Sequence, residues 1–206
     1  MQALSRFGFL ALLAVPAQAI AGDLDLGERV YRDECVNCHG DLAQGGKGGE
    51  YPRLAGQRAD YLLLQLNNFR DRTRRNKPML PVFETGKLKE PDLEAVAAYL
   101  SSLPLPPPTE VGVPAGVEGD LELGLELYER DCLLCHGADG QGKDEKGYPQ
   151  IIAQYPSYLA KQMADFSNRE RWHEYGDKLF GEAYPEELDA LLALILSLNQ
   201  EPIDPS

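Results

Sequence analysis

Cys35-Val36-Asn37-Cys38-His39 is repeated 97 residues later as Cys132-Leu133-Leu134-Cys135-His136, and these two pentapeptides contain all four cysteines of the chain. Cys-x-x-Cys-His is the attachment signature of a c-type haem. Two thiols about one helical turn apart can each add to one vinyl group of the macrocycle, and the adjacent imidazole then becomes the proximal ligand of the iron. The repeat predicts two covalently bound haems, attached at Cys35, Cys38, Cys132 and Cys135 and ligated by His39 and His136.

Two other uses of these cysteines agree less well with the sequence. A zinc site needs four ligands, and Cys-x-x-Cys-His supplies three at most. The first half has no further cysteine and no histidine besides His39, so zinc there would need a carboxylate. A disulfide within each Cys-x-x-Cys would suit an exported protein, but it leaves both histidines without a role.

The N-terminus predicts export. Arg6 precedes an apolar run from Phe7 to Val15, and Ala17-Gln18-Ala19 and Ala19-Ile20-Ala21 both resemble small-residue cleavage sites. This order is typical of a secretory signal peptide, which we place at residues 1–21. The apolar run is shorter than the ~20 residues that span a bilayer, and no other segment is long enough. We therefore expect a soluble periplasmic protein with no membrane span in the mature chain.

The repeat extends over most of the chain. Tyr51-Pro52 recurs as Tyr148-Pro149 with the same offset of 97, and Leu103 matches Leu198 with an offset of 95. A unit of this length exceeds the ~20 to 50 residues of a solenoid repeat and therefore predicts two tandem domains. Consecutive prolines between them favour an extended, stiff linker. The expected boundaries are 22–103 and 120–206 for the domains and 104–119 for the proline-rich linker.

Each domain has the hydrophobic spacing of helices and no strand-like alternation, so the predicted fold class is all-α. In the first domain we expect helices from about Leu24 to Cys35, Asp60 to Phe69 and Pro91 to Ser102, with counterparts that begin near Leu121, Pro156 and Pro185. Gly27 and Gly124 lie inside the N-terminal helix of each domain, where glycine is destabilising by about 1 kcal/mol relative to alanine. A close crossing of the last helix of the domain explains the missing side chain.

The two Cys-x-x-Cys-His motifs, the Tyr-Pro after each, the Tyr-x-x-x-Gln-x-x-x-Phe helices and the proline-rich linker resemble the diheme cytochrome c4 family. Similar two-lobe haem subunits occur in flavocytochrome c sulfide dehydrogenase. The resemblance implies two class I cytochrome c domains that face each other about a pseudo-twofold axis and work in periplasmic electron transfer. It also implies that the Pro52 carbonyl holds the ring of His39 and the Pro149 carbonyl that of His136. A ligating histidine almost always donates its other N–H to such an acceptor.

The distal ligands are expected to differ between the lobes. Met79 is the one methionine of the mature first lobe and stands at the family position of the sixth ligand, although a lone methionine more often packs in a core. In the second lobe the equivalent positions are Glu174 and Gly176, which are not strong-field ligands. His173 is the candidate that we favour there, with Met163 or an open iron site as the alternatives.

Charge is also divided unequally. Residues 22–103 carry 12 basic and 13 acidic side chains, whereas residues 110–206 carry 7 and 20, so the net charge of −13 resides in the second half. A basic cluster from Arg70 to Lys77 precedes Met79 and would attract an acidic redox partner, unless it is only a solvated face. An acidic exported protein is not expected to bind nucleic acid.

The expected function is electron transfer, and the expected protein is not an enzyme. We expect a periplasmic diheme cytochrome that passes electrons from a dehydrogenase to a respiratory or photosynthetic acceptor, such as an oxidase or a small cytochrome. A narrower form of the same expectation is the electron-accepting subunit of a sulfur-compound dehydrogenase. The rival hypotheses are a peroxidase-like haem enzyme and a ligand sensor, and both need an open second iron. Thiosulfate oxidation at a cysteine-ligated haem is excluded, because attachment of two haems leaves no free cysteine.

Overall fold

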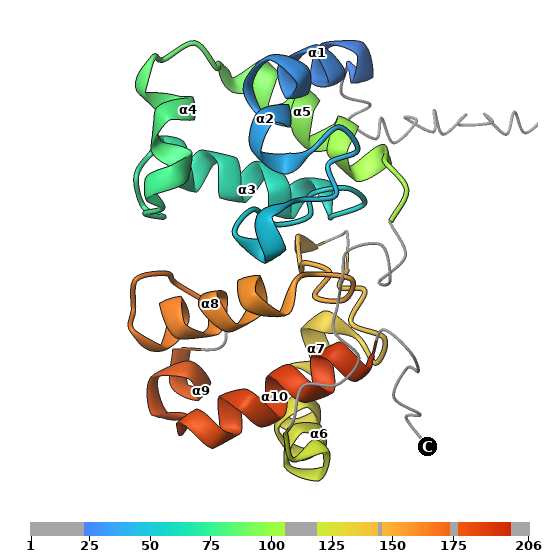
Figure 1. The fold of residues 1–206 in the computed structure, drawn as a ribbon, viewed down its shortest axis with the longest axis vertical. Helices are drawn as coiled ribbons and strands as arrows, with labels where there is room; N and C mark the ends of the chain where they lie inside the picture. Colours follow the sequence, from blue (N-terminus) through green and yellow to red (C-terminus); the bar gives the residue numbers. More distant parts are fainter. Residues whose placement is uncertain (1–22, 106–118, 144–145, 174–176, 199–206) are drawn as a thin grey trace, which may run out of the picture.

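The computed structural model describes residues 23–105, 119–143, 146–173 and 177–198, which form two helical lobes (Figure 1). The first lobe contains α1 (Leu24–Glu34), α2 (Val36–His39), η1 (Lys47–Gly49), α3 (Ala59–Arg70), η2 (Lys77–Met79), α4 (Leu80–Glu84) and α5 (Glu90–Ser102). The second contains α6 (Leu121–Asp131), α7 (Leu133–His136), α8 (Pro156–Ser167), α9 (Asp177–Glu182) and α10 (Pro185–Ser197). The predicted all-α class is confirmed. The expected signal peptide and nearly all of the expected linker lie outside the described residues.

Capping side chains set where the main helices begin. The Asp23 carboxylate accepts a hydrogen bond from the backbone N–H of Leu26 at 2.9 Å, and Asp120 accepts one from Leu123 at 3.0 Å. Such an N-cap contributes about 1 kcal/mol. Both α5 and α10 have proline in the first turn, where its missing N–H has no helical partner to lose. The last helix of each lobe therefore begins at or next to the proline that predicts it.

The first and last helices of each lobe cross at a glycine. A Cβ atom on Gly27 would lie 2.2 Å from the carbonyl oxygen of Ala95 in α5, and one on Gly124 would lie 2.4 Å from that of Ala190 in α10. No side chain fits at these distances, so the backbones of α1 and α5, and of α6 and α10, meet directly. The close crossing predicted from the two glycines is confirmed.

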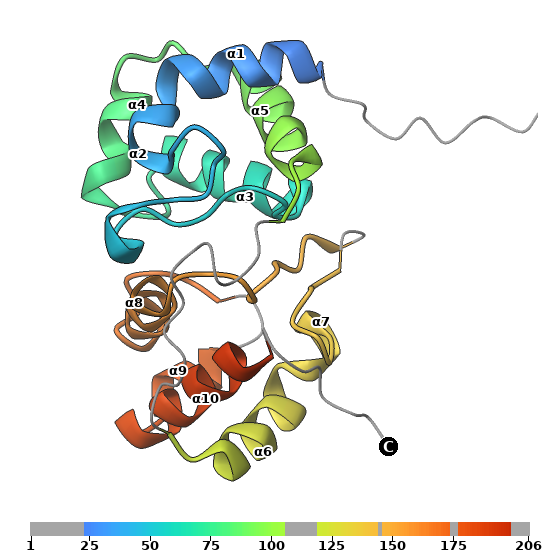
Figure 2. The ribbon, with the colours of Figure 1, turned by 45° about the vertical axis from the view of Figure 1, so that its right-hand side comes forward.

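The two lobes meet along α3 and α8 and the loops before them (Figures 1 and 2). Gln57 donates to the Gln150 carbonyl at 2.8 Å and accepts from the Gln150 N–H at 2.8 Å. Gln154 makes the same pair of bonds to the backbone of Arg53, at 3.1 and 3.0 Å. Gln57 is equivalent to Gln154, and Arg53 to Gln150, in the 97-residue repeat. Each half of this interface thus repeats the other, as a pseudo-twofold arrangement of the lobes requires.

Arg53 fixes the lobes to each other. The residue is 1% exposed, and its guanidinium donates to the carbonyls of Ala153 at 2.7 Å, Ile152 at 2.9 Å and Ala55. Burial lowers the pKa of Arg53 to about 10, so the side chain is still charged at neutral pH. A buried charge is tolerated only when its donors are satisfied, and here the backbone carbonyls of both lobes satisfy them.

Candidate functional site

Each Cys-x-x-Cys-His motif lies where the N-terminal helix of a lobe ends and a short helix follows. α2 ends at His39, and α7 ends at His136. The Tyr31 hydroxyl donates to the Gly40 carbonyl at 2.5 Å, and the Tyr128 hydroxyl donates to the Gly137 carbonyl at 2.7 Å. A buried tyrosine therefore fastens each motif to the N-terminal helix of its lobe, directly after the histidine.

The two motif histidines are held in the same way. Nδ1 of His39 lies 2.9 Å from the Pro52 carbonyl, and Nδ1 of His136 lies 3.0 Å from the Pro149 carbonyl. Burial lowers the pKa of both rings, and the carbonyls oppose this shift without cancelling it. A neutral ring that donates from Nδ1 leaves its Nε2 lone pair free for a metal, which is the arrangement of most ligating histidines.

The motif cysteines are placed for attachment of a macrocycle. The N–H of His39 donates to the Cys35 carbonyl at 3.0 Å, so one helical turn connects the first cysteine to the histidine, and Cys132 and His136 repeat this contact at 2.9 Å. The four thiols are unpaired. Burial raises the pKa of Cys35 and of Cys132 to about 12, so both are neutral thiols before haem is bound.

In the second lobe the structure brings His173 to His136, 37 residues away in the chain. The two ring centroids are 6.3 Å apart. His173 packs edge-on against Phe166, with centroids 4.9 Å apart, and lies 5.2 Å from the ring of Phe180. Burial lowers the pKa of His173 to about 4, and the nearby His136 and Arg171 add to this shift, so the ring is neutral at physiological pH.

The spacing of these rings fits an iron between them. Two imidazoles that bind one metal from opposite sides have centroids about 6 Å apart, since each metal–nitrogen bond is about 2 Å long. Nδ1 of His173 is also buried without a hydrogen-bond partner in the part of the chain that the structure describes. This ring therefore lacks the carbonyl acceptor that holds Nδ1 of His39 and of His136, and an unpartnered buried nitrogen needs a partner that the described residues do not supply. The residues of the second lobe therefore fit a haem held between two histidines.

The two candidate methionines lie in different surroundings. Met79 ends η2, immediately before α4, and is half-buried. Met163 is 7% exposed and belongs to the apolar core of the second lobe, together with Leu127 and Leu159. Packing in a core is the common role of a methionine, and it accounts for Met163 without a bond to iron.

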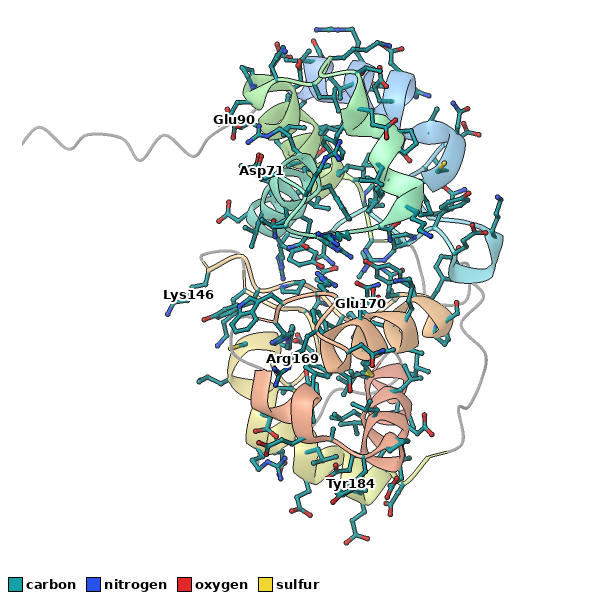
Figure 3. The ribbon with its side chains drawn as sticks, turned by 90° about the vertical axis from the view of Figure 1, so that its left-hand side faces the viewer. Asp71, Glu90, Lys146, Arg169, Glu170 and Tyr184 are labelled. Carbon is teal, nitrogen blue, oxygen red and sulfur yellow. The ribbon has the colours of Figure 1, made fainter. Side chains whose placement is uncertain are left out.

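The basic cluster from Arg70 to Lys77 is only partly a surface feature. Arg70 pairs with Glu90 at 2.6 Å and with Asp71 at 3.2 Å; both acids are labelled in Figure 3. Arg74 is 7% exposed and points into the boundary between the lobes. The exposed part of the cluster, which we call the basic patch, consists of Arg72, Arg75 and Lys77.

The role of Arg74 was not predicted, although the repeat contains a signal for it. Arg74 and Arg171 are equivalent in the 97-residue repeat, as are Tyr61 and Tyr158. An arginine that recurs at the same repeat position together with its tyrosine partner indicates a structural site. A solvated surface charge does not need to recur with a particular partner.

Comparison with known proteins agrees with this geometry. The family model described as cytochrome c matches residues 24–104 and 121–199. The chain is 33% identical to the thiosulfate dehydrogenase electron acceptor of Stutzerimonas stutzeri (strain A1501) over 167 residues, which cover 75% of this chain and 74% of that protein. It is 31% identical to cytochrome c4 of Stutzerimonas stutzeri over 172 residues, which cover 77% and 79%. The crystal structure of reduced recombinant cytochrome c4 from Pseudomonas stutzeri aligns with a TM-score of 0.68 at 25% identity, over 84% of this chain and 97% of that chain.

These similarities imply two covalently bound haem c groups per chain, one on each Cys-x-x-Cys-His motif. They also show the general activity of the relatives, which is electron transfer by a two-haem cytochrome. Within the described ranges, no helix combines the length and the apolar character that crossing a bilayer requires.

Proposed function

This chain belongs to the cytochrome c family, and on that basis we propose that it is a periplasmic electron carrier and not an enzyme. It takes electrons from a dehydrogenase and delivers them to an oxidase or a small cytochrome. The first haem is held by His39 and Met79, and the second by His136 and His173. Pro52 and Pro149 orient the proximal rings, with which they share hydrogen bonds of 2.9 and 3.0 Å.

The main support for a second haem between two histidines is the distance of 6.3 Å between the ring centroids of His136 and His173. Imidazole in place of thioether stabilises ferric iron and lowers the reduction potential. The second lobe is then the low-potential site, and electrons enter there and leave through the first lobe. A histidine on each side also closes the second iron to peroxide or a gaseous ligand, which counts against the peroxidase-like and sensor hypotheses.

The class of the electron donor is supported by similarity. The relative from Stutzerimonas stutzeri (strain A1501) is named for accepting electrons from thiosulfate dehydrogenase. We therefore propose a dehydrogenase of sulfur compounds as the donor. The signal-like residues 1–21 support a periplasmic location for this exchange.

The proposed direction can be tested by rapid mixing of the oxidised protein with reduced thiosulfate dehydrogenase. The haem without methionine ligation should be reduced first, and the methionine-ligated haem should follow by transfer within the molecule. A variant that lacks the second haem, Cys132→Ala with Cys135→Ala, should accept electrons from the dehydrogenase much more slowly. Reduction of the methionine-ligated haem first, or an unchanged rate in the variant, would contradict the direction. Turnover of hydrogen peroxide would instead favour the peroxidase-like hypothesis.

The basic patch should govern the reaction of the first lobe with anionic partners. Arg72→Glu with Lys77→Glu should slow oxidation of the reduced protein by ferricyanide several-fold at about 0.01 M ionic strength, where charges interact over about 30 Å. The difference from wild type should vanish at about 1 M, where this range is about 3 Å. Stopped-flow absorbance measures both rates. If the variant matches wild type at low salt, the patch is only a solvated face.

A further inference from the structure

The loop that follows α3 has the same backbone hydrogen bonds as the loop that follows α8. The backbone N–H of Arg74 donates to the Asn68 carbonyl at 3.0 Å, and that of Arg171 donates to the Asp165 carbonyl at 3.0 Å. Both donors and both acceptors are related by the 97-residue repeat. The chain therefore follows the same course in the two lobes as it leaves these helices.

The repeat continues on the far side of each loop. α4 and α9 begin 97 residues apart in the chain. Phe83 in α4 lies against Phe69 in α3, with ring centroids 6.3 Å apart, and their counterparts Phe180 and Phe166 are 5.0 Å apart. The register of the repeat is thus the same before and after the loop.

Asn76 and His173 are equivalent residues in these two loops. Oδ1 of Asn76 and Nδ1 of His173 are both buried, and neither has a hydrogen-bond partner among the residues that the structure describes. In the second lobe this position faces the motif histidine, because the ring of His173 lies 6.3 Å from that of His136. The repeat therefore predicts that Asn76 faces His39 in the same way.

Asn76 has no local use for its side chain. It is the N-cap residue of η2, but its side chain makes no capping bond. An N-cap asparagine normally accepts a hydrogen bond from the N–H of the second or third helical residue. Here the second is Pro78, which has no N–H, and the third is Met79, whose N–H already donates to the Asn76 carbonyl at 3.0 Å. The carbonyl thus holds the backbone of Met79, and the amide is left for another role.

We propose that this repeat position, occupied by Asn76 in the first lobe and His173 in the second, determines which residue binds each iron. Histidine and methionine are common axial ligands of haem iron, and the neutral amide of asparagine is not. Asn76 therefore leaves the sixth position of the first haem to Met79, whose backbone it fixes, and acts as a positioning residue. His173 binds the second iron directly. The inference rests on the ligands proposed above for the two haems.

One exchange of side chain within the repeat then accounts for the unequal haems. Imidazole in place of thioether stabilises ferric iron and lowers the reduction potential. The lobe with asparagine at this position is the high-potential site, and the lobe with histidine is the low-potential site. The direction of electron flow through the molecule consequently depends on this position.

The test places a histidine at this position in the first lobe of the two-haem protein. Asn76→His should lose the weak far-red band of methionine-ligated ferric haem and stay low-spin at both irons, because imidazole displaces Met79. The potential of its first haem should fall toward that of the second in a redox titration. Lys77→His is the matched control, since it brings the same imidazole to the exposed next residue and should keep the band and both potentials. A band of full intensity in Asn76→His, or its loss in both variants, overturns the proposal.

His173→Asn tests the same position in the second lobe and replaces Asn76→His if that variant does not retain both haems. An amide there should leave the second iron without a sixth ligand, so this haem should become high-spin and bind added imidazole, while the far-red band of the first haem is unchanged. A second haem that is low-spin in His173→Asn but high-spin in His173→Ala would show that the amide binds iron and would overturn the proposal. A low-spin second haem in both variants, or a wild type without the far-red band, would contradict the proposed ligands themselves, and this inference with them.

Discussion

The double variant Cys35→Ala with Cys38→Ala should carry one haem per chain, where the wild-type protein carries two. Both thioether bonds of the first haem are lost, while the second motif has its own helix α7, its own tyrosine contact at 2.7 Å and its own lobe. A pyridine haemochrome assay against protein concentration measures the stoichiometry, and haem staining of a denaturing gel should still show covalent haem.

The matched control is the equivalent change in the other lobe. Cys132→Ala with Cys135→Ala should also leave one haem, now the methionine-ligated one. Two haems in either variant, or haem that acidified acetone extracts from the wild-type protein, would contradict covalent attachment at these two motifs.

Gly27→Ala should destabilise the first lobe by about 2 kcal/mol or more, as overpacking at a rigid contact does. The new methyl group would lie 2.2 Å from the Ala95 carbonyl oxygen, and a backbone atom cannot move aside as a flexible side chain can. The intrinsic gain in helix propensity of about 1 kcal/mol is too small to offset this clash. Denaturant unfolding of the haem-loaded protein, followed by circular dichroism, measures the difference.

Arg29→Ala is the matched control, because Arg29 is exposed on the same helix and gives up no buried contact. Gly124→Ala should repeat the loss in the second lobe, where the corresponding distance is 2.4 Å. If Gly27→Ala unfolds at the same denaturant concentration as Arg29→Ala, the helices do not cross as closely as described.

Local signals in the sequence predicted most of the fold. Pro91 and Pro185 lie in the first turns of α5 and α10, and Gly27 and Gly124 predict crossings that the structure contains. Each of these features acts within a few residues or across one helix contact. Side-chain chemistry and periodicity reveal such features directly, which explains why these predictions succeeded.

The contacts between the lobes could not be predicted in the same way. Arg74 belongs to a run of basic residues, which is typical of an exposed charged surface. In the structure it is buried and bonds to Gln162 and Tyr158 in the other lobe. Arg53 likewise follows Pro52 without any local pattern that marks it. These interactions join residues 84 to 101 positions apart, beyond the range of helical periodicity. The one sequence signal that bears on them is the 97-residue repeat, in which Arg74 recurs as Arg171 and Tyr61 as Tyr158.

The candidate haem sites were predicted partly from local signals and partly by a choice among alternatives. The Cys-x-x-Cys-His motifs were predicted from their own spacing, which is specific to haem attachment. The roles of the Pro52 and Pro149 carbonyls were predicted from the resemblance to the diheme cytochrome c4 family. His173 was chosen from three alternatives, since the second lobe lacks a methionine at the equivalent position. Its ring centroid lies 6.3 Å from that of His136, a distance compatible with His173 as the ligand, and the assignment stays a prediction.

Unequal ligation of the two haems is the central claim, and the absorption spectrum of oxidised wild type and His173→Ala tests it most directly. Ferric haem with a methionine ligand has a characteristic weak far-red band, which two histidines do not give. Wild type should be low-spin at both irons and show this band at the intensity of one haem in two. His173→Ala should convert the second haem to a high-spin form and leave the far-red band of Met79 unchanged. If the second haem keeps its spectrum and potential in His173→Ala, then Met163 or an open site replaces His173, and the direction of electron flow proposed for the two lobes is wrong.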